Sequence, residues 1–145
     1  MTPQEADNAK KLLTGSKVFA INSRDGFAAQ YPTLGQLSSE EWDSLLTIAG
    51  TGTALLMIPS RYTPEQQKEL TATVVMTIQE WDENGVQSLA DFINFVTTGA
   101  RDSNEVPDVI GGWVVRNLSM LQEEHSAAHV IGLMLMNTFA PWWDQ

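Results

Sequence analysis

The sequence contains no cysteine in its 145 residues. This absence excludes disulfide bonds, thiolate catalysis and cysteine-ligated zinc. Long hydrophobic runs are missing too, because the two most apolar stretches, Leu45–Ile58 and Ala127–Phe139, are shorter than the about 20 residues of a membrane span. The first eleven residues are polar and lack the apolar core of a secretory signal, so we expect a cytoplasmic protein that makes no membrane contact.

Basic residues are few, since eight Lys and Arg stand against eighteen Asp and Glu, which gives a net charge of −10. Four of these eight lie within residues 1–24, so the excess of negative charge belongs to the rest of the chain. Nucleic acids and anionic membranes bind cationic surfaces, and we expect neither as a partner. The charge favours a protein partner with a basic surface, although an acidic surface also serves solubility alone.

Signals for helix starts recur along the chain. Segments 2–5 and 63–66 each place a capping threonine, a proline and a capping-box glutamate or glutamine in order. Apolar residues recur at intervals of three and four, and the alternation typical of a β-strand is missing. The sequence therefore predicts an all-α helical bundle of five or six helices without a sheet, in a single domain that spans residues 1–145.

Glycine and proline set the expected boundaries of the first helix. It should run to about Leu13 and stop at Gly15, because glycine is common just after a helix end. An irregular connection, Ser16–Gly35, is expected next, since an Asp-Gly pair and a Tyr-Pro pair interrupt it. Its larger apolar side chains should pack on the body of the protein; they are Val18, Phe19, Ile21 and Phe27.

Further helices are expected in the rest of the chain. The second should begin at Ser38 and end at Pro59, and its Gly50 and Gly52 are tolerable if another helix lies close against them. Three more helical segments follow the second helix. They span Thr63–Asn84, Ser88–Gly99 and Asp108–Phe139, the last as one long helix or as two abutting helices.

Two histidines, His125 and His129, are the best local candidates for a metal site. They lie four residues apart, so they share one side of a helix and can bind one metal ion. If Asp108–Phe139 is one continuous helix, both imidazoles point toward the core. Buried structural histidines fit the same pattern, and a metal site would need an Asp or Glu that the sequence does not identify. Apart from this divalent metal, we expect no cofactor.

Residues 80–91 superficially resemble an EF-hand calcium loop, with oxygen-bearing side chains at five ligand positions and Gly85 at the sixth position. The first residue is a glutamate instead of an aspartate, and the last is the short Asp91. Helix capping is a simpler explanation of the same residues. One helix would end at Asn84 and the next would start at Ser88.

Partner-binding residues are predicted in two places. Glu40, Glu41 and Asp43 gather negative charge at a helix start, where part of it offsets the helix dipole. Trp142 and Trp143 form a pair near the end of the sequence, and tryptophan is typical of interface hot spots. This pair would either contact a partner, including a second copy of the chain, or fold back over the open end of the bundle.

No motif commits the chain to an enzymatic reaction. A GxSxG elbow, a phosphate-binding glycine loop and a dinucleotide fingerprint are all missing. These absences and the charge predict a non-catalytic protein that binds another protein and regulates, inhibits or neutralises it. One alternative is a metal-binding bundle, as an enzyme or a binding protein, that uses His125 and His129. Another is a bundle that binds a small molecule beside its glycine-rich stretches.

Overall fold

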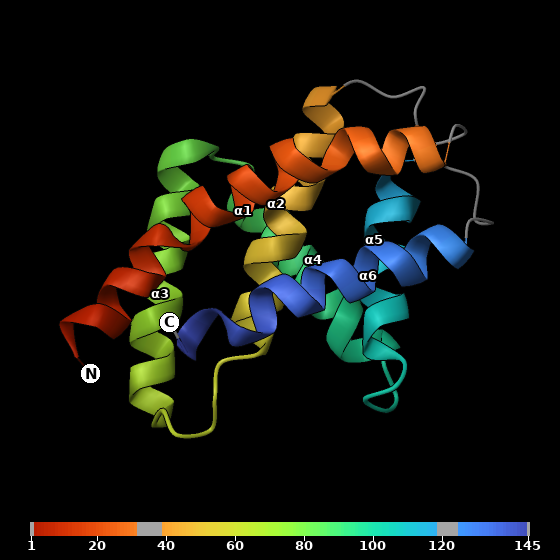
Figure 1. Cartoon of the computed structure of the whole chain (residues 1–145). Coiled ribbons are helices and arrows are strands. Elements are labelled where there is room, and N and C mark those ends of the chain that lie inside the picture. Colours follow the sequence, from red (N-terminus) through yellow and green to blue (C-terminus); the bar gives the residue numbers. More distant parts are fainter. Residues whose placement is uncertain (1, 32–38, 119–124, 145) are drawn as a thin grey trace.

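The computed structural model describes residues 2–31, 39–118 and 125–144 (Figure 1). These residues form six α-helices and one short 3₁₀-helix, and no β-strand occurs among them. The predicted all-α bundle is confirmed. The elements are α1 (Pro3–Gln30), α2 (Ser39–Leu56), α3 (Pro64–Trp81), α4 (Gly85–Gly99), α5 (Val106–Leu118), α6 (His125–Phe139) and η1 (Ala140–Asp144).

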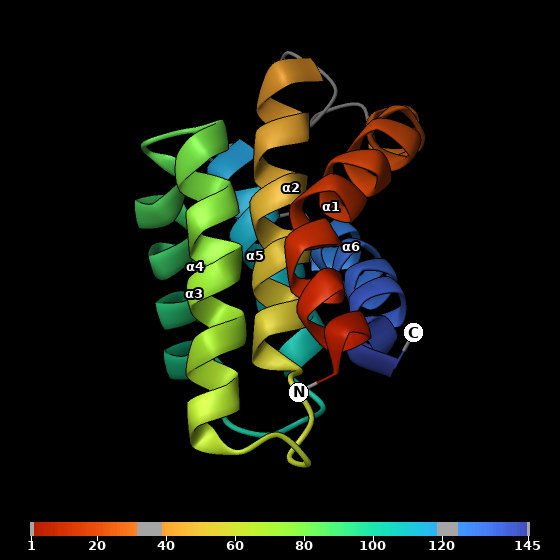
Figure 2. The ribbon, with the colours of Figure 1, turned by 90° about the vertical axis from the view of Figure 1, so that its left-hand side faces the viewer.

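Helix α2 lies at the centre of the fold. It packs against α1, α4, α5 and α6, and every residue from Leu46 to Leu55 is buried. A helix that is buried on all sides needs no polar face, which explains the small and apolar side chains of this stretch. Figures 1 and 2 show α2, α3, α4 and α5 running along a common direction, with α1 and α6 packed across one side of them.

Two glycines of α2 allow aromatic rings to approach its backbone. A β-carbon on Gly50 would lie 2.7 Å from the Phe139 ring, and one on Gly52 would overlap the Phe92 ring. The expectation that other helices lie close against these glycines is confirmed. The two rings occupy the space beside Gly50 and Gly52.

Helix α1 continues well past the predicted stop at Gly15. It is unbroken from Pro3 to Gln30, so the irregular connection predicted from Ser16 onward is wrong as far as Gln30. Gly15 lies inside the helix because the ring of Trp142 packs where a β-carbon would be. This glycine therefore permits close packing and does not end the helix. The remainder of the predicted connection, residues 32–35, lies outside the described residues.

The apolar residues of this segment divide between two faces of α1. Phe27 is buried, and Phe19 packs edge-on against Phe139 with ring centroids 5.5 Å apart. Val18 and Ile21, in contrast, are 52% and 55% exposed. The expectation that all four side chains pack on the body is therefore right for the two phenylalanines and wrong for the two branched residues, because these lie on the outer face of the helix.

The last predicted helical segment is two helices, α5 and α6, that pack against each other. A β-carbon on Gly111 would overlap the backbone of Ala128, and one on Gly132 would overlap the backbone of Pro107. The two backbones therefore touch at two points, which one continuous helix could not do. The alternative of a single long helix is wrong, and residues 119–124 lie outside the described part of the chain.

The predicted capping box of α3 and the predicted threonine cap of α1 are confirmed. The hydroxyl of Thr63 accepts a hydrogen bond from the backbone N–H of Gln66, whose side chain accepts one in return from the N–H of Thr63. The hydroxyl of Thr2 accepts a hydrogen bond from the N–H of Glu5 at 3.2 Å. These local side-chain contacts satisfy backbone donors that the first helical turn leaves without partners.

The boundaries of α2 and α4 differ by a few residues from the prediction. Helix α2 ends at Leu56 rather than at Pro59, and its predicted start at Ser38 lies outside the described residues. Helix α4 begins at Gly85 rather than at Ser88. None of the described helices is long and apolar enough to cross a membrane.

Candidate functional site

The two C-terminal tryptophans are held by the protein itself. Trp143 is 1% exposed, and its indole N–H donates a hydrogen bond to the carbonyl oxygen of Ala54 at 2.7 Å. Trp142 packs over Gly15, and its N–H donates to the carbonyl oxygen of Asn8 at 2.9 Å. Both rings thus fold back onto the bundle, and Trp143 has almost no surface left for a partner.

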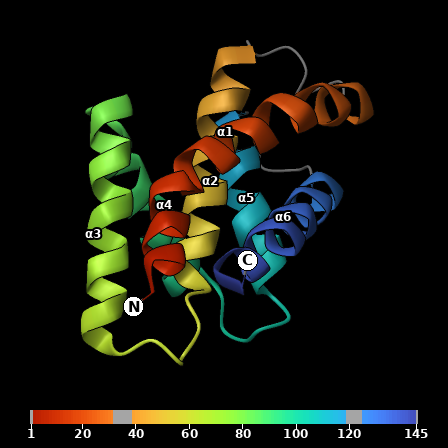
Figure 3. The ribbon, with the colours of Figure 1, turned by 60° about the vertical axis from the view of Figure 1, so that its left-hand side comes forward.

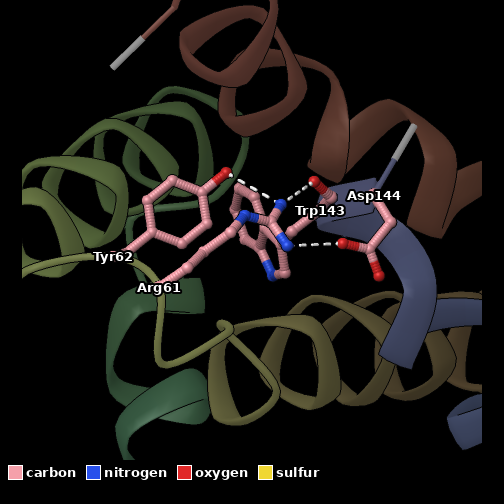
Figure 4. Close-up of polar contacts among 4 residues, drawn as sticks. All are labelled: Arg61, Tyr62, Trp143 and Asp144. Carbon is pink, nitrogen blue, oxygen red and sulfur yellow. Dashed lines mark hydrogen bonds and ion pairs between the residues drawn. The ribbon is translucent and has the colours of Figure 1, made fainter.

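Arg61 holds the same segment from the loop between α2 and α3 (Figure 4). Its terminal nitrogens donate hydrogen bonds to the Asp144 carboxylate and to the Trp143 carbonyl oxygen, each at 2.7 Å. The guanidinium carbon also lies 4.9 Å from the centre of the Tyr62 ring. The hydrogen bond with Asp144 raises the pKa of Arg61. The positive charge of Arg61 is therefore paired within the chain, at the end of the bundle where α2 stops.

His129 lies on the surface. Its side chain is 54% exposed, and its Nδ1 lies 2.5 Å from Oδ1 of Asp108 on α5. The predicted inward orientation is wrong for His129, because α6 is a separate helix that buries a face including Ala127 and Leu135. The side chain of His125 is outside the described part, and no group of three His, Cys, Asp or Glu within that part could hold a metal ion. Metal binding by His125 and His129 stays a prediction.

The calcium-loop alternative for residues 80–91 is wrong. Helix α3 runs to Trp81 and α4 starts at Gly85, so only three residues lie between the helices. An EF-hand loop needs about twelve residues whose ligands converge on the ion. The Asp82 carboxylate instead accepts a hydrogen bond from the backbone N–H of Asn84 at 2.9 Å and closes a tight turn.

The acidic residues at the start of α2 have two different roles. Asp43 forms an ion pair with Arg24 of α1, and its hydrogen bond raises the pKa of Arg24. Glu40 and Glu41 lie in the first turn of α2, where carboxylates offset the positive end of the helix dipole, and both are exposed. Asp43 thus links two helices, whereas Glu40 and Glu41 are exposed at the start of α2.

A hollow of about 470 Å³ lies between the start of α2 and the end of α5. Glu40, Glu41, Ser44, Leu45 and Asn117 line it. The hollow therefore combines two carboxylates with an apolar side chain. This combination suits a lysine or arginine side chain, because its aliphatic part packs on the leucine while its charge meets the carboxylates.

More negative charge lies at the same end of the bundle. Helix α2 begins at the end where α3 stops (Figure 1), and Glu80, Asp82 and Glu83 are exposed there. A carboxylate near a helix C-terminus adds to the negative end of the dipole and lowers stability. Asp82 closes the turn and Glu83 directly precedes Asn84, the N-cap of α4, but Glu80 has no such stabilising explanation. We call Glu40, Glu41, Glu80 and Glu83 the acidic end.

Two basic residues of α1 contact the end of α3 and the start of α2. Lys17 places its Nζ 5.1 Å from the centre of the Trp81 ring, and Arg24 pairs with Asp43. Neither of them lines the hollow. These two positive charges thus lie against α3 and α2, whereas the hollow opens between α2 and α5.

Part of this site could have been found in the sequence. Glu80 is detectable because an acid in the last turn of a helix has no capping role. Asn117 is not detectable, since only the packing of α5 beside α2 brings it next to Glu40. The pairing of Asp43 with Arg24 is likewise a long-range contact that no local pattern indicates.

Comparison with known protein families, with curated proteins and with solved structures found no match. The chemistry of the acidic end and its hollow therefore provides the basis for a functional proposal. The hollow offers negative charge and an apolar contact, and both favour a basic side chain as its ligand.

Proposed function

We propose that this protein is non-catalytic and that it binds a basic partner protein through its acidic end, thereby regulating, inhibiting or neutralising that partner. The hollow lined by Glu40, Glu41 and Leu45 carries the proposal, because its lining matches a lysine or arginine side chain. Glu80 and Glu83 at the same end of the bundle would meet further positive charge, and the net charge of −10 would speed the encounter. The cytoplasmic location stays a prediction.

Affinity capture with three baits tests this proposal. The first bait is the wild type, and the second carries Glu40→Lys and Glu41→Lys. The third carries Glu65→Lys and Glu69→Lys, which make the same charge change on exposed residues of α3, away from the acidic end. A partner that the first and third baits retain and the second loses supports the proposal. Equal retention by all three baits contradicts it, and so does equal loss from both variants.

Association kinetics with the captured partner provide a second test. The association rate should fall as salt is added, because exposed charges are screened beyond about 8 Å at physiological ionic strength. Reversal of Glu40 and Glu41 should slow association and leave the dissociation rate little changed. An association rate that responds neither to salt nor to this reversal would mean that the acidic end serves solubility alone.

Binding of a divalent metal ion at His125 and His129 is a second candidate function. One observation favours it: the Asp108 carboxylate lies 2.5 Å from Nδ1 of His129, and such a contact orients many metal-binding histidines. Zinc or nickel should then raise the melting temperature of the wild type and not that of His129→Ala. Equal melting temperatures with and without metal, for both proteins, would remove this candidate.

A further inference from the structure

The outer face of α1 carries a regular row of residues that no other described helix covers. The row has intervals of three and four; it consists of Lys11, Thr14, Val18, Ile21 and Asp25. All five residues are exposed, while the buried residues of α1 lie on the opposite side of the helix. Intervals of three and four are those of the contact positions in a pair of packed helices.

Val18 and Ile21 occupy the middle of this row. They are two of the five large apolar side chains that are exposed in the described part of the chain. Branched side chains lower helix propensity slightly, and an exposed one gains little from burial, so the stability of the monomer does not explain them. Single exposed apolar residues are common, but these two occupy successive positions of one row.

The two ends of the row carry opposite charges. Lys11 lies seven residues before Val18 and Asp25 seven residues after it, so the charges are about 21 Å apart along the helix. The Lys11 and Asp25 side chains are 65% and 88% exposed. Their contacts are with their own helix, at 2.8 Å to Asp7 and 3.6 Å to Arg24. Such exposed pairs contribute little to stability and leave both charges available for a partner.

We propose that a second copy of this chain docks on this row, with the two α1 helices antiparallel about a twofold axis at Val18. The row is then self-complementary, since Lys11 of each copy lies beside Asp25 of the other and the apolar residues meet at the centre. A parallel pairing would bring like charges together and is disfavoured. Helix α1 crosses the outer side of α2 in Figures 1 and 3, so a second α1 can approach along its length.

The proposed dimer is weak and depends on concentration. One pair of helices with two apolar residues each buries less surface than a permanent dimer, and small interfaces belong to transient complexes. The dimer also goes beyond the proposed function. None of the row residues lines the hollow or belongs to the acidic end, so the two proposals fail or succeed independently.

A single introduced thiol tests the position of the twofold axis. Because the chain has no cysteine, Val18→Cys places the only thiol at the centre of the proposed interface. Under mild oxidation it should form a disulfide-linked dimer at least about tenfold faster than Met76→Cys, since a disulfide needs close Cα atoms. Met76 is a matched control, because it is an exposed apolar residue on α3 outside the row. Equal cross-linking rates for the two variants would overturn the proposal.

Sedimentation equilibrium of charge variants tests the antiparallel orientation. Lys11→Glu and Asp25→Lys should each weaken the dimer about three- to tenfold, because each leaves two like-charged contacts across the twofold axis. The double variant carries both substitutions, so each contact across the twofold axis again joins opposite charges. Its dissociation constant should therefore return to the wild-type value. A double variant that dimerises more weakly than either single variant would overturn the antiparallel arrangement.

The apolar centre is tested with Val18→Glu and Ile21→Glu in one chain. Both positions are exposed in the monomer, so circular dichroism should still show a folded helical protein. The variant should remain monomeric at concentrations where the wild type and Met76→Glu dimerise. A wild type that is monomeric at millimolar concentration, or a dimer that survives in the double glutamate variant, would overturn the proposal.

Discussion

The two ends of the central helix α2 use charge in different ways. Where α2 stops, Arg61 is bound to Asp144 and to the Trp143 carbonyl oxygen, and the C-terminal segment covers the core. Where α2 starts, Glu40 and Glu41 line a hollow with an apolar wall. The first end is closed by contacts within the chain, whereas the second matches a basic side chain from outside it.

This difference separates residues that stabilise the fold from residues that are available for binding. Substitutions at the closed end should lower the free energy of unfolding and leave the binding surface intact in the folded molecules. Substitutions at the acidic end should weaken binding and leave stability almost unchanged. Variants at the two ends therefore test the comparison directly.

The largest effect is expected for Trp143→Ala. The indole is fully buried and donates a hydrogen bond to Ala54, so its removal should lower the free energy of unfolding by about 3–5 kcal/mol. Urea denaturation followed by circular dichroism measures the change. A loss below about 1 kcal/mol would mean that the C-terminal segment does not close this end of the bundle.

A smaller loss is expected for Gly15→Ala. The added β-carbon would overlap the ring of Trp142, so the segment must shift and the free energy of unfolding should fall by about 1–3 kcal/mol. Gly26→Ala is the matched control on the same helix, because no atom lies within 4 Å of its added β-carbon. That control should stabilise the protein by up to about 1 kcal/mol. Equal effects at the two positions would contradict the packing of Trp142 on α1.

A still smaller effect is expected for Arg61→Gln. The side chain is about half exposed, so its ion pair with Asp144 is screened by solvent, and the hydrogen bond to the Trp143 carbonyl oxygen is the main loss. The melting temperature should fall less than in Gly15→Ala, and high salt should reduce the difference from the wild type. A melting temperature as low as that of Trp143→Ala would show that the contacts of Arg61 with Asp144 and the Trp143 carbonyl oxygen, more than the buried indole, hold the C-terminal segment in place.

The smallest effect on stability is expected for Glu40→Gln combined with Glu41→Gln. Both side chains are exposed in the first turn of α2, so the free energy of unfolding should change by only about 0.5 kcal/mol. Binding of a basic partner should weaken, while Glu65→Gln with Glu69→Gln leaves it near the wild-type value. Isothermal titration and urea denaturation of both variants measure the two quantities. A large loss of stability with unchanged binding would show that Glu40 and Glu41 stabilise the fold and do not bind the partner.

Local patterns predicted much of the fold. The capping box at Thr63 and the period of the apolar residues are signals within one helix, so the helices and the lack of strands among the described residues could be predicted. The predicted helix end at Gly15 is wrong because the role of this glycine depends on Trp142, which is distant in the sequence. The inward orientation of His129 is predicted only for one continuous helix, and the close contact of α5 with α6 excludes that helix.

The candidate site could be predicted only in part. Charge alone predicts Glu40 and Glu41 as partner-binding residues, and both line the hollow. Asp43 was grouped with them, but its contact with Arg24 binds α1 to α2. Contacts between distant helices decide these roles, and a single sequence does not record which helices become neighbours.

Binding of a basic side chain to the hollow can be measured most directly by an NMR titration. The probe is a short capped peptide with one central arginine, and the control peptide has norleucine in its place. The proposed function predicts chemical-shift changes at the backbone amides of Glu40–Leu45 and Asn117, which disappear with the control peptide and in the Glu40→Gln and Glu41→Gln double variant. Shifts of equal size at Glu65 and Glu69, or no shifts at all, would contradict it.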